Sequence, residues 1–328
     1  MAEINLVEAV NLALGHALES DPDVLLLGED IGVNGGVFRA TAGLQARFGA
    51  ARVMDTPLAE GGIVGAAIGM AAMGLRPVAE IQFTGFIYPA IDHIINHAAR
   101  MRHRTRGRLS CPLVVRSPCG AGIHAPEHHS ESPEAMFAHM PGLRVVVPSS
   151  PARAYGLLLA AIADPDPVIF LEPTRLYRLY RLFRQEVADD GAALPLDTCF
   201  TLREGNDITL VTWGAMVQET LTAADELAAE GVSATVIDVA TLKPLDMPTI
   251  LEAVARTGRC VIVHEAPRTA GFGAEIAAEL ADAGLYSLAA PVQRVAGFDT
   301  VVPLARLEYT YLPSAARIAD AARKAMAA

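Results

Sequence analysis

Short apolar runs alternate with segments of helical periodicity along the first half of the chain. Between residues 6 and 19, apolar side chains recur every three or four positions, which predicts an amphipathic helix. The run Val24–Leu27 ends at Gly28 and is typical of a strand buried on both faces. We expect further strands at Arg52–Met54, Pro77–Ile81, Leu113–Arg116, Leu143–Val147 and Val168–Leu171, and further helices at Gly62–Met73, Ile87–Arg102 and Pro151–Ala163. This alternation predicts a mostly parallel sheet with helices on both faces.

The same alternation resumes in the second half, after a break between residues 173 and 200. Here we expect strands at Ile208–Trp213, Thr235–Val239, Cys260–His264 and Val292–Val295, and helices at Val217–Ala229, Pro248–Arg256, Ala274–Ala281 and Ala315–Met326. The break contains a basic and aromatic stretch, Arg175–Arg181, which could bind RNA but is a single stretch in an acidic chain. A chain of 328 residues suits two domains, which we place at 1–185 and 205–328 with a linker at 186–204.

Charge and hydropathy narrow the classes of partner. The net charge of −11 disfavours nucleic acid as the main partner. A hydrophobic content of 52% and a mean hydropathy of +0.32 indicate either a membrane protein or a subunit with large apolar interfaces. The longest apolar run, Gly61–Leu75, is shorter than the roughly 20 residues that span a bilayer. We therefore expect an obligate oligomer that does not enter a membrane.

The cysteines and the N-terminus carry no sign of export. Cys111, Cys119, Cys199 and Cys260 form no CxxC pair, and their spacing suits neither a zinc ribbon nor a small disulfide scaffold. Residues 1–5 lack the basic and apolar regions of a signal peptide. We therefore predict reduced cysteines and a cytoplasmic protein.

The sequence motifs give little support for a nucleotide site or a zinc site. The glycines around Gly271 and Gly120 lack the third glycine of a dinucleotide fingerprint, and no phosphate-binding GxxxxGK[ST] loop occurs. Zinc could be suggested by His124, His128 and His129 with Glu127, but their spacing is not that of HExxH. A dehydrogenase that binds its own NAD and a zinc enzyme are therefore both disfavoured.

Glu60 is followed by glycines at every fourth position. Its carboxylate could simply favour the dipole at a helix N-terminus, an effect of ~0.3–1 kcal/mol. Gly61, Gly65 and Gly69 leave one helix face without side chains, so another helix can approach closely. That face fits either a subunit interface or packing within the chain.

Ten segments, in order along nearly the whole chain, resemble beta subunits of the decarboxylating (E1) component of 2-oxo acid dehydrogenase complexes. The segments are Gly28–Asp30, Gly35–Phe38, Arg52–Glu60, Pro77–Phe83, Arg116–Pro118, His129–Ala135, Pro141–Leu143, Phe170–Pro173, His264–Pro267 and Gly297–Thr300. The segment after His129 and the Ile81–Phe83 strand end are most similar to the branched-chain members. Pyruvate and acetoin dehydrogenase beta subunits are near relatives.

The resemblance implies a transketolase-like α/β fold, with a pyrimidine-binding domain and a transketolase C-terminal-like domain. It implies that this chain holds the aminopyrimidine of thiamin diphosphate, while an alpha subunit holds the diphosphate and Mg²⁺ through a Gly-Asp-Gly motif. No Gly-Asp-Gly occurs in this sequence. We therefore expect an incomplete active site that an alpha subunit completes in an alpha2beta2 heterotetramer.

The resemblance also assigns candidate site residues. Glu60 matches the glutamate that hydrogen-bonds the aminopyrimidine, and Phe86 matches an aromatic residue that packs on it, where many branched-chain members have Tyr. Leu58 and Gln82 match other positions of the cofactor pocket. Glu29 matches a residue of an acidic network that links paired active sites. His129 matches the histidine at the entrance for the substrate and the lipoyl group, and the adjacent His128 is the alternative.

A structural potassium ion is a further implication of the resemblance. Main-chain carbonyls and an aspartate bind this ion in family members, and Leu113, Ala161, Asp164 and Asp166 match their positions. A solvated acidic turn is the simpler interpretation of the two aspartates. Val114 stands where some relatives have Thr, which would remove an oxygen ligand.

The resemblance implies decarboxylation of a branched-chain 2-oxo acid, followed by transfer of the acyl group to a lipoyl domain of a dihydrolipoyl acyltransferase core. The cofactor supplies the electrophilic chemistry and the protein positions it. A pyruvate or acetoin dehydrogenase beta subunit is the first alternative. A non-catalytic subunit that only supports the alpha chain is an alternative of another class.

Overall fold

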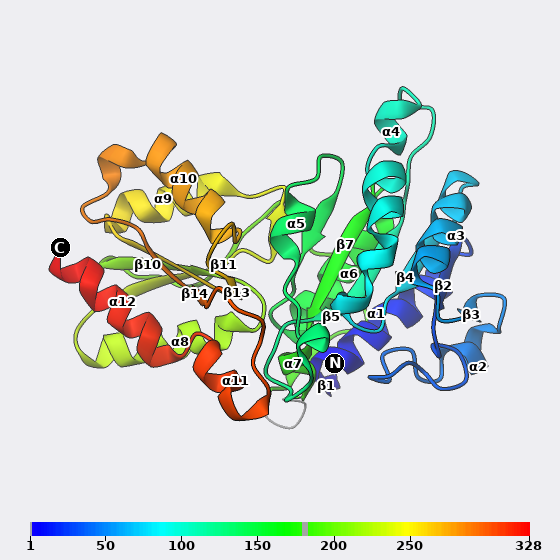
Figure 1. Ribbon diagram of the computed structural model, residues 1–328, viewed down its shortest axis with the longest axis horizontal. Helices are drawn as coiled ribbons and strands as arrows, with labels where there is room; N and C mark the ends of the chain where they lie inside the picture. The colour runs from blue at the N-terminus through cyan, green and yellow to red at the C-terminus, as the bar shows by residue number, and fades with distance from the viewer. Residues whose placement is uncertain (1, 179–182) are drawn as a thin grey trace.

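Two lobes, each built on its own sheet, make up the molecule (Figure 1). The computed structural model describes residues 2–178 and 183–328. In the described part of the chain, no helix is both long and apolar enough to cross a membrane.

The sheet of the first lobe has seven strands in the order β12-β6-β7-β5-β4-β2-β3, as described. All neighbouring strands are parallel except β12 and β6. The strands are β2 (Val24–Gly28), β3 (Val53–Asp55), β4 (Arg76–Glu80), β5 (Val114–Cys119), β6 (Arg144–Val146), β7 (Val168–Pro173) and β12 (Thr241–Lys243). The strands predicted for the first half thus all form, although their ends differ by up to three residues.

Helices cover both faces of this sheet because its strands are apolar on both sides. In β2, Val24 and Leu26 pack with α1 (Leu6–Ser20) and α6 (Pro151–Ala163), whereas Leu25 and Leu27 pack with α3 (Glu60–Ala72). Asn5 and Glu8 form a capping box that starts α1. The shorter helices of this lobe are α2 (Leu44–Phe48), η4 (Glu127–His129), α5 (Glu134–Ala138) and α7 (Thr174–Arg178).

The single helix predicted at Ile87–Arg102 is wrong. The segment follows η1 (Thr84–Phe86) and instead forms three short elements: η2 (Tyr88–Ala90), the π-helix η3 (His93–Ala98) and α4 (Met101–Arg104). Pro89 lies within the first turn of η2, where a proline is tolerated because it needs no N–H partner. The Ala99 N–H donates to the Ile94 carbonyl, five residues back, which is the wider turn of a π-helix.

The glycine face of α3 packs within the chain over its first two turns. A Cβ atom at Gly61 would lie 3.2 Å from the Pro89 carbonyl oxygen, and one at Gly65 would lie 3.8 Å from the His93 ring. A Cβ atom at Gly69 would meet open space. Intrachain packing therefore explains Gly61 and Gly65, while the face at Gly69 is left free.

The second lobe has a five-stranded sheet, as described, in the order β14-β13-β10-β11-β9, in which only β9 is antiparallel to its neighbour. Its strands are β9 (Phe200–Arg203), β10 (Ile208–Thr212), β11 (Ala234–Asp238), β13 (Cys260–Pro267) and β14 (Gln293–Gly297). Its helices are α8 (Met216–Ala229), α9 (Met247–Thr257), α10 (Gly273–Ala283), η5 (Leu285–Ser287), α11 (Ala305–Tyr311) and α12 (Ala315–Ala327).

Two strands tie distant parts of the chain together. β12, from the second half of the sequence, pairs with the edge strand β6 of the first lobe. β1 (Ala2–Ile4) pairs with β8 (Gln185–Val187), which follows the first lobe. The predicted linker at 186–204 contains the end of β8 and all of β9. The basic and aromatic stretch at 175–181 lies partly outside the described residues.

All four cysteines are buried and free, as expected for reduced thiols. Burial raises the pKa of each thiol, to about 12 at Cys111 and Cys260. A thiol with a raised pKa is a poor nucleophile, so the cysteines are packing residues.

Candidate functional site

Three predicted cofactor residues follow the carboxyl ends of neighbouring parallel strands. Glu29 comes directly after β2, Glu60 begins α3 shortly after β3, and Gln82 comes two residues after β4. Gly28 of β2 pairs in register with both Asp55 and Glu80, so the three strands end at one level. Open α/β sheets bind ligands at this edge.

Glu29 and Glu60 interact electrostatically across this edge. Partial burial raises the pKa of Glu29, and the carboxylates of Asp30 and Glu60 raise it further. Glu60 is the first residue of α3, and the preceding Ala59 offers no side-chain cap. The free N–H groups of that first turn therefore favour negative charge at Glu60.

Leu58 stands beside Glu60 with 70% of its surface exposed. A single exposed apolar residue is common on protein surfaces, so Leu58 does not mark an interface by itself. It places an apolar contact beside Glu60 at the ligand-binding edge of the sheet.

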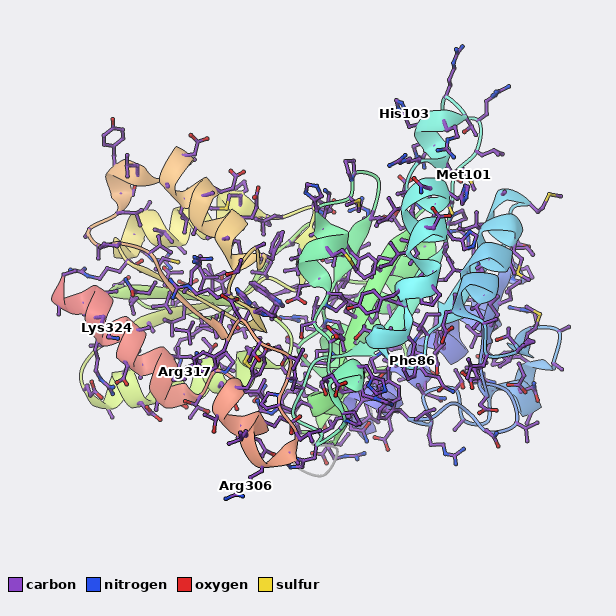
Figure 2. The ribbon with its side chains drawn as sticks, viewed as in Figure 1. Phe86, Met101, His103, Arg306, Arg317 and Lys324 are labelled. Carbon is purple, nitrogen blue, oxygen red and sulfur yellow. The ribbon has the colours of Figure 1, made fainter. Side chains whose placement is uncertain are left out.

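His129 lies in an aromatic cluster at the same end of the first lobe. Its ring is 4.3 Å from that of Phe83 and 5.2 Å from that of Phe86, both in edge contact. The Nδ1 atom of His129 is buried without a hydrogen-bond partner in the structure. Figure 2 shows Phe86 at the base of the helical segment that leads to α4.

The environment of His129 differs from that of its neighbour His128. Burial lowers the pKa of His129, and the nearby His128 lowers it further. His128 is exposed, and its Nδ1 lies 3.7 Å from Glu127. Of the two, His129 alone contacts both Phe83 and Phe86, which favours it as the residue that faces the site.

A hollow of about 500 Å³ opens beside this cluster. Phe38, Phe83 and Tyr177 provide aromatic walls, and Ile123 and His124 close it from the loop that precedes η4. Phe38 also contacts Phe83 and Tyr177 edge-on, at 5.4 and 5.2 Å. Arg39 and His124 add polar groups to these aromatic walls, and a concave site with both kinds of group suits a small molecule.

Beneath the site lies a buried ionic network that the sequence analysis assigned no role. Arg116 of β5 donates to Glu80 of β4 and to both carboxylate oxygens of Glu172 of β7. The Tyr177 hydroxyl also donates to Glu172. Burial disfavours the charge on Arg116, but the two carboxylates outweigh it and raise the pKa of Arg116. The network joins three strand ends that support the site.

The signal for this network was visible in the sequence. Glu80, Arg116 and Glu172 each lie within an apolar strand that is buried on both faces. A charge in such a strand is costly unless it is paired. Two acidic residues and one basic residue in three buried strands therefore indicate that they pair with one another.

Carboxylates of the second lobe hold the loop that carries His129. Glu308 accepts hydrogen bonds from the backbone N–H groups of Gly122 and His124, at 2.7 and 3.0 Å. Glu265 accepts from the Ala121 N–H at 3.0 Å and from the Ser132 hydroxyl at 3.2 Å. The position of the loop thus depends on the second lobe.

Glu134, near Glu265, is a further buried carboxyl group. The Glu134 carboxylate lies 3.4 Å from the Trp213 indole nitrogen, which donates to it. Burial raises the pKa of Glu134 to about 8 and that of Glu265 to about 7. Glu134 is therefore largely protonated near neutral pH, which lowers the cost of burying it between the lobes.

The zinc alternative finds no support in this geometry. His124 contacts Glu308, with 3.0 Å between Nδ1 and Oε2, and His129 packs among phenylalanines. His264 is buried and stacks on Trp213 at 5.2 Å. These histidines do not converge on one point.

The residues predicted to bind potassium gather around the turn after α6. Asp164 forms an ion pair with Arg144 at 2.8 Å and accepts the Asp166 N–H at 2.8 Å, and Asp166 pairs with Arg102. The Ala161 carbonyl accepts the Asp164 N–H, and the Leu113 carbonyl accepts the Val168 N–H. Each predicted ligand thus already has one protein partner.

The comparisons with known proteins agree with this architecture. Residues 2–179 match the pyrimidine-binding domain of transketolase, and residues 198–318 match the transketolase C-terminal domain. A solved structure described as a split-gene transketolase, an inactive beta4 tetramer, superposes with a TM-score of 0.81 at 24% identity, covering 99% of each chain. The fold is therefore that of a transketolase-like α/β protein.

The sequence relatives are more specific. A protein of Bacillus subtilis named pyruvate dehydrogenase E1 component subunit beta is 49% identical, over 99% of both chains. A protein of the same name from Staphylococcus epidermidis is 48% identical, over 98% of both chains. The chain belongs to the transketolase-like family of 2-oxo acid dehydrogenase E1 beta subunits. This family uses thiamin diphosphate, and its beta subunits work with an alpha partner.

Proposed function

We propose that the chain contributes the pyrimidine half of a thiamin diphosphate site, which an alpha subunit completes in an alpha2beta2 heterotetramer. The observation that carries this proposal is the pair Glu29 and Glu60 at the carboxyl edge of the first sheet, beside the exposed Leu58. A carboxylate, an amide at Gln82 and an aromatic ring at Phe86 suit a planar, basic aminopyrimidine.

Thiamin diphosphate, when bound, would supply a nucleophilic carbon that adds to the 2-oxo carbon and would stabilise the electron pair left when carbon dioxide departs. In our proposal Glu60 exchanges a proton with the aminopyrimidine nitrogen, and Phe86 packs against the ring. Leu58 and Gln82 complete the contact, and Glu29 adjusts the charge around Glu60. The residues of this chain thus bind and orient the aminopyrimidine and exchange a proton with it, while the alpha subunit binds the diphosphate and Mg²⁺.

We assign His129 to the second half-reaction, reductive acylation of a lipoyl group. Loss of carbon dioxide needs no protein acid, whereas opening the lipoyl disulfide releases a thiolate that benefits from a proton donor. Burial lowers the pKa of His129, so its protonated form is a stronger acid than ordinary imidazolium. Its position beside a hollow with aromatic walls fits a role at the entrance for the acyltransferase-linked lipoyl domain.

Exposed apolar side chains support the obligate partner. In the second lobe, Phe298, Val301, Leu304, Leu307 and Tyr309 are all more than half exposed within a stretch of twelve residues. In the first lobe, Leu58 and Met73 are 70% and 84% exposed at the two ends of α3. Surfaces of this kind mark protein interfaces.

The branched-chain substrate stays a prediction. The printed names of the relatives favour pyruvate, the alternative weighed in the sequence analysis. The test is to measure kcat/KM for pyruvate and for 3-methyl-2-oxobutanoate in a complex with the cognate alpha subunit. A preference for pyruvate would rule out the branched-chain assignment and leave the family intact.

The same reconstitution tests the function itself. We expect no thiamin-diphosphate-dependent decarboxylation by the isolated chain and full activity on addition of the alpha subunit. Robust decarboxylation by the pure chain would contradict the shared site. An assembled complex whose activity is indifferent to Glu60→Gln would instead favour a purely structural subunit.

The potassium site is also proposed, at the turn that contains Ala161, Asp164 and Asp166, with Leu113 from the neighbouring strand end. Two observations support it: the two aspartates and the Ala161 carbonyl lie together in this turn, and oxygen donors suit a hard cation. Arg144 already neutralises Asp164, which limits the charge available to the ion.

A further inference from the structure

Three potential metal ligands lie on η3 and on the residue before it, in the segment that packs against α3. Asp92, His93 and His97 each place one ligand atom within 4.8 Å of the others, the one such grouping within residues 2–178 and 183–328. The rings of His93 and His97 have centroids 5.7 Å apart and planes inclined by 31°. The two imidazoles thus lie side by side on one helix face.

The four-residue spacing of the two histidines accounts for this pairing. Residues four apart lie on the same face of a helix, and positions 93 and 97 stay on one face in the π-helix η3. Asp92, the residue before η3, adds a carboxylate to the two imidazoles.

The neighbours of His93 restrict its movement. Its ring lies over the glycine face of α3, where a Cβ atom at Gly61 or Gly65 would contact it at 3.7–3.8 Å. Asn96 donates a hydrogen bond to the Asp92 carboxylate, which orients a second potential ligand. Ligands that are held in place before the ion arrives lose less freedom on binding.

The donor set determines which ion fits. Two imidazole nitrogens with one carboxylate oxygen suit Zn²⁺ and neighbouring transition metals, whereas Mg²⁺ and Ca²⁺ prefer oxygen ligands alone. Ligands of one tetrahedral Zn²⁺ are on the order of 3.3 Å apart, given bond lengths of about 2.0–2.1 Å. Asp92 and His97 are exposed, so their side chains can rotate by the small amount required.

We propose that Asp92, His93 and His97 bind one divalent transition-metal ion, with Zn²⁺ as the representative, at a site separate from the thiamin diphosphate site. Three protein ligands leave a fourth position for water. All three ligands come from one segment, and His93 of that segment packs on Gly61, next to Glu60, so the ion lies near the first turn of α3 without binding to it. This site is independent of the proposed catalytic function.

The test is calorimetric titration of the full-length chain with Zn²⁺. We expect one equivalent to bind with a micromolar Kd, and His97→Ala to raise that Kd more than about tenfold. His93→Gln should have the same effect while still filling the space over the glycines. His103→Ala is the matched control, since Figure 2 shows His103 on α4 at the far tip of the same segment.

Thermal unfolding supplies a second readout. Zn²⁺ should raise the Tm of wild type and of His103→Ala but not of His97→Ala, because binding to the folded state stabilises it. Equal Kd values in wild type and His97→Ala would show that other histidines hold the ion and would overturn the proposal. Absence of binding by wild type at about 100-fold the protein concentration would overturn it equally.

Discussion

The His129 ring packs edge-on against Phe83, with 4.3 Å between the ring centroids, and its buried Nδ1 atom has no hydrogen-bond partner among residues 2–178 and 183–328. A buried nitrogen without a hydrogen bond costs free energy. Such an atom is therefore expected where a group of the substrate supplies the missing hydrogen bond. His129→Ala should therefore slow acyl transfer to a lipoyl domain far more than decarboxylation measured with an artificial electron acceptor.

Both assays must use the same assembled mutant complex. His128→Ala is the matched control, because His128 is the exposed neighbour. Equal loss in both half-reactions would mean that His129 orders the cofactor or its loop. If only His128→Ala slowed acyl transfer, the assignment would move to that residue.

Glu60→Gln should abolish cofactor activation while the complex still assembles. Glutamine keeps the size of the side chain but cannot exchange a proton in the same way. Loss of a positioned acid–base group costs about 10²–10⁴-fold in rate. The measurement is kcat of the reconstituted complex, and retention of more than about a tenth of the wild-type value would exclude the role.

The buried Glu134 makes stability depend on pH. Its pKa is about 8 in the folded chain, against 4.5 for an ordinary glutamate, so the folded state binds more protons between these values. The free energy of unfolding should therefore fall as the pH rises from about 5 to 8, by at most ~1.4 kcal/mol per pH unit for this group.

Urea unfolding at several pH values measures this dependence. Glu134→Gln should reduce the slope, because glutamine stays neutral throughout, while the buried Glu265, whose pKa is raised to about 7, keeps part of it. Glu279→Gln, at an exposed position on α10, should leave the slope unchanged. A slope in Glu134→Gln equal to that of wild type would assign the effect to another group.

Arg116→Met should destabilise the first lobe strongly. The substitution leaves Glu80 and Glu172 buried close together without a cation, and breaking a buried ion pair typically costs about 3–5 kcal/mol. The free energy of unfolding in urea measures the effect. Arg203→Met removes an exposed pair with Asp225 and should cost less than about 1 kcal/mol, so similar losses in both would contradict the network's importance.

Potassium should raise the Tm of wild type relative to a large organic cation at the same ionic strength, because an ion that binds the folded state stabilises it. Asp164→Ala should abolish the difference between the two salts. That variant also loses the Arg144 pair, so the salt difference, rather than the absolute Tm, is the relevant quantity. Equal melting curves of wild type in both salts would count against the site.

Strand positions were predictable because burial on both faces leaves a simple signal in sequence. In β2, Val24 and Leu26 face one core, and Leu25 and Leu27 face the other. Because both faces are buried, the strand appears in the sequence as an uninterrupted apolar run. The segment after Thr84 was not predictable in the same way. The spacing of its apolar residues is helical, but Pro89 and the wide turn at Ile94–Ala99 divide the segment into shorter elements. The hydrophobic period alone does not reveal either interruption.

The candidate site could be predicted only in part. Motif resemblance singled out Glu60 and His129, which lie on elements at the same edge of the first lobe. It did not indicate Glu265 and Glu308, which reach across from the second lobe to hold the loop around His124. Such contacts join residues more than 140 positions apart, and no local pattern encodes them.

The pairing of β12 with β6 limits how the gene can be divided. A fragment that stops in the predicted linker, before residue 205, lacks Thr241–Lys243 and leaves the edge of β6 at Val145 and Val146 without its partner strand. An open strand edge recruits other chains and promotes aggregation. A soluble pyrimidine-binding fragment would therefore have to carry a grafted copy of the β12 sequence, much as a missing strand is donated in trans by a complementing peptide.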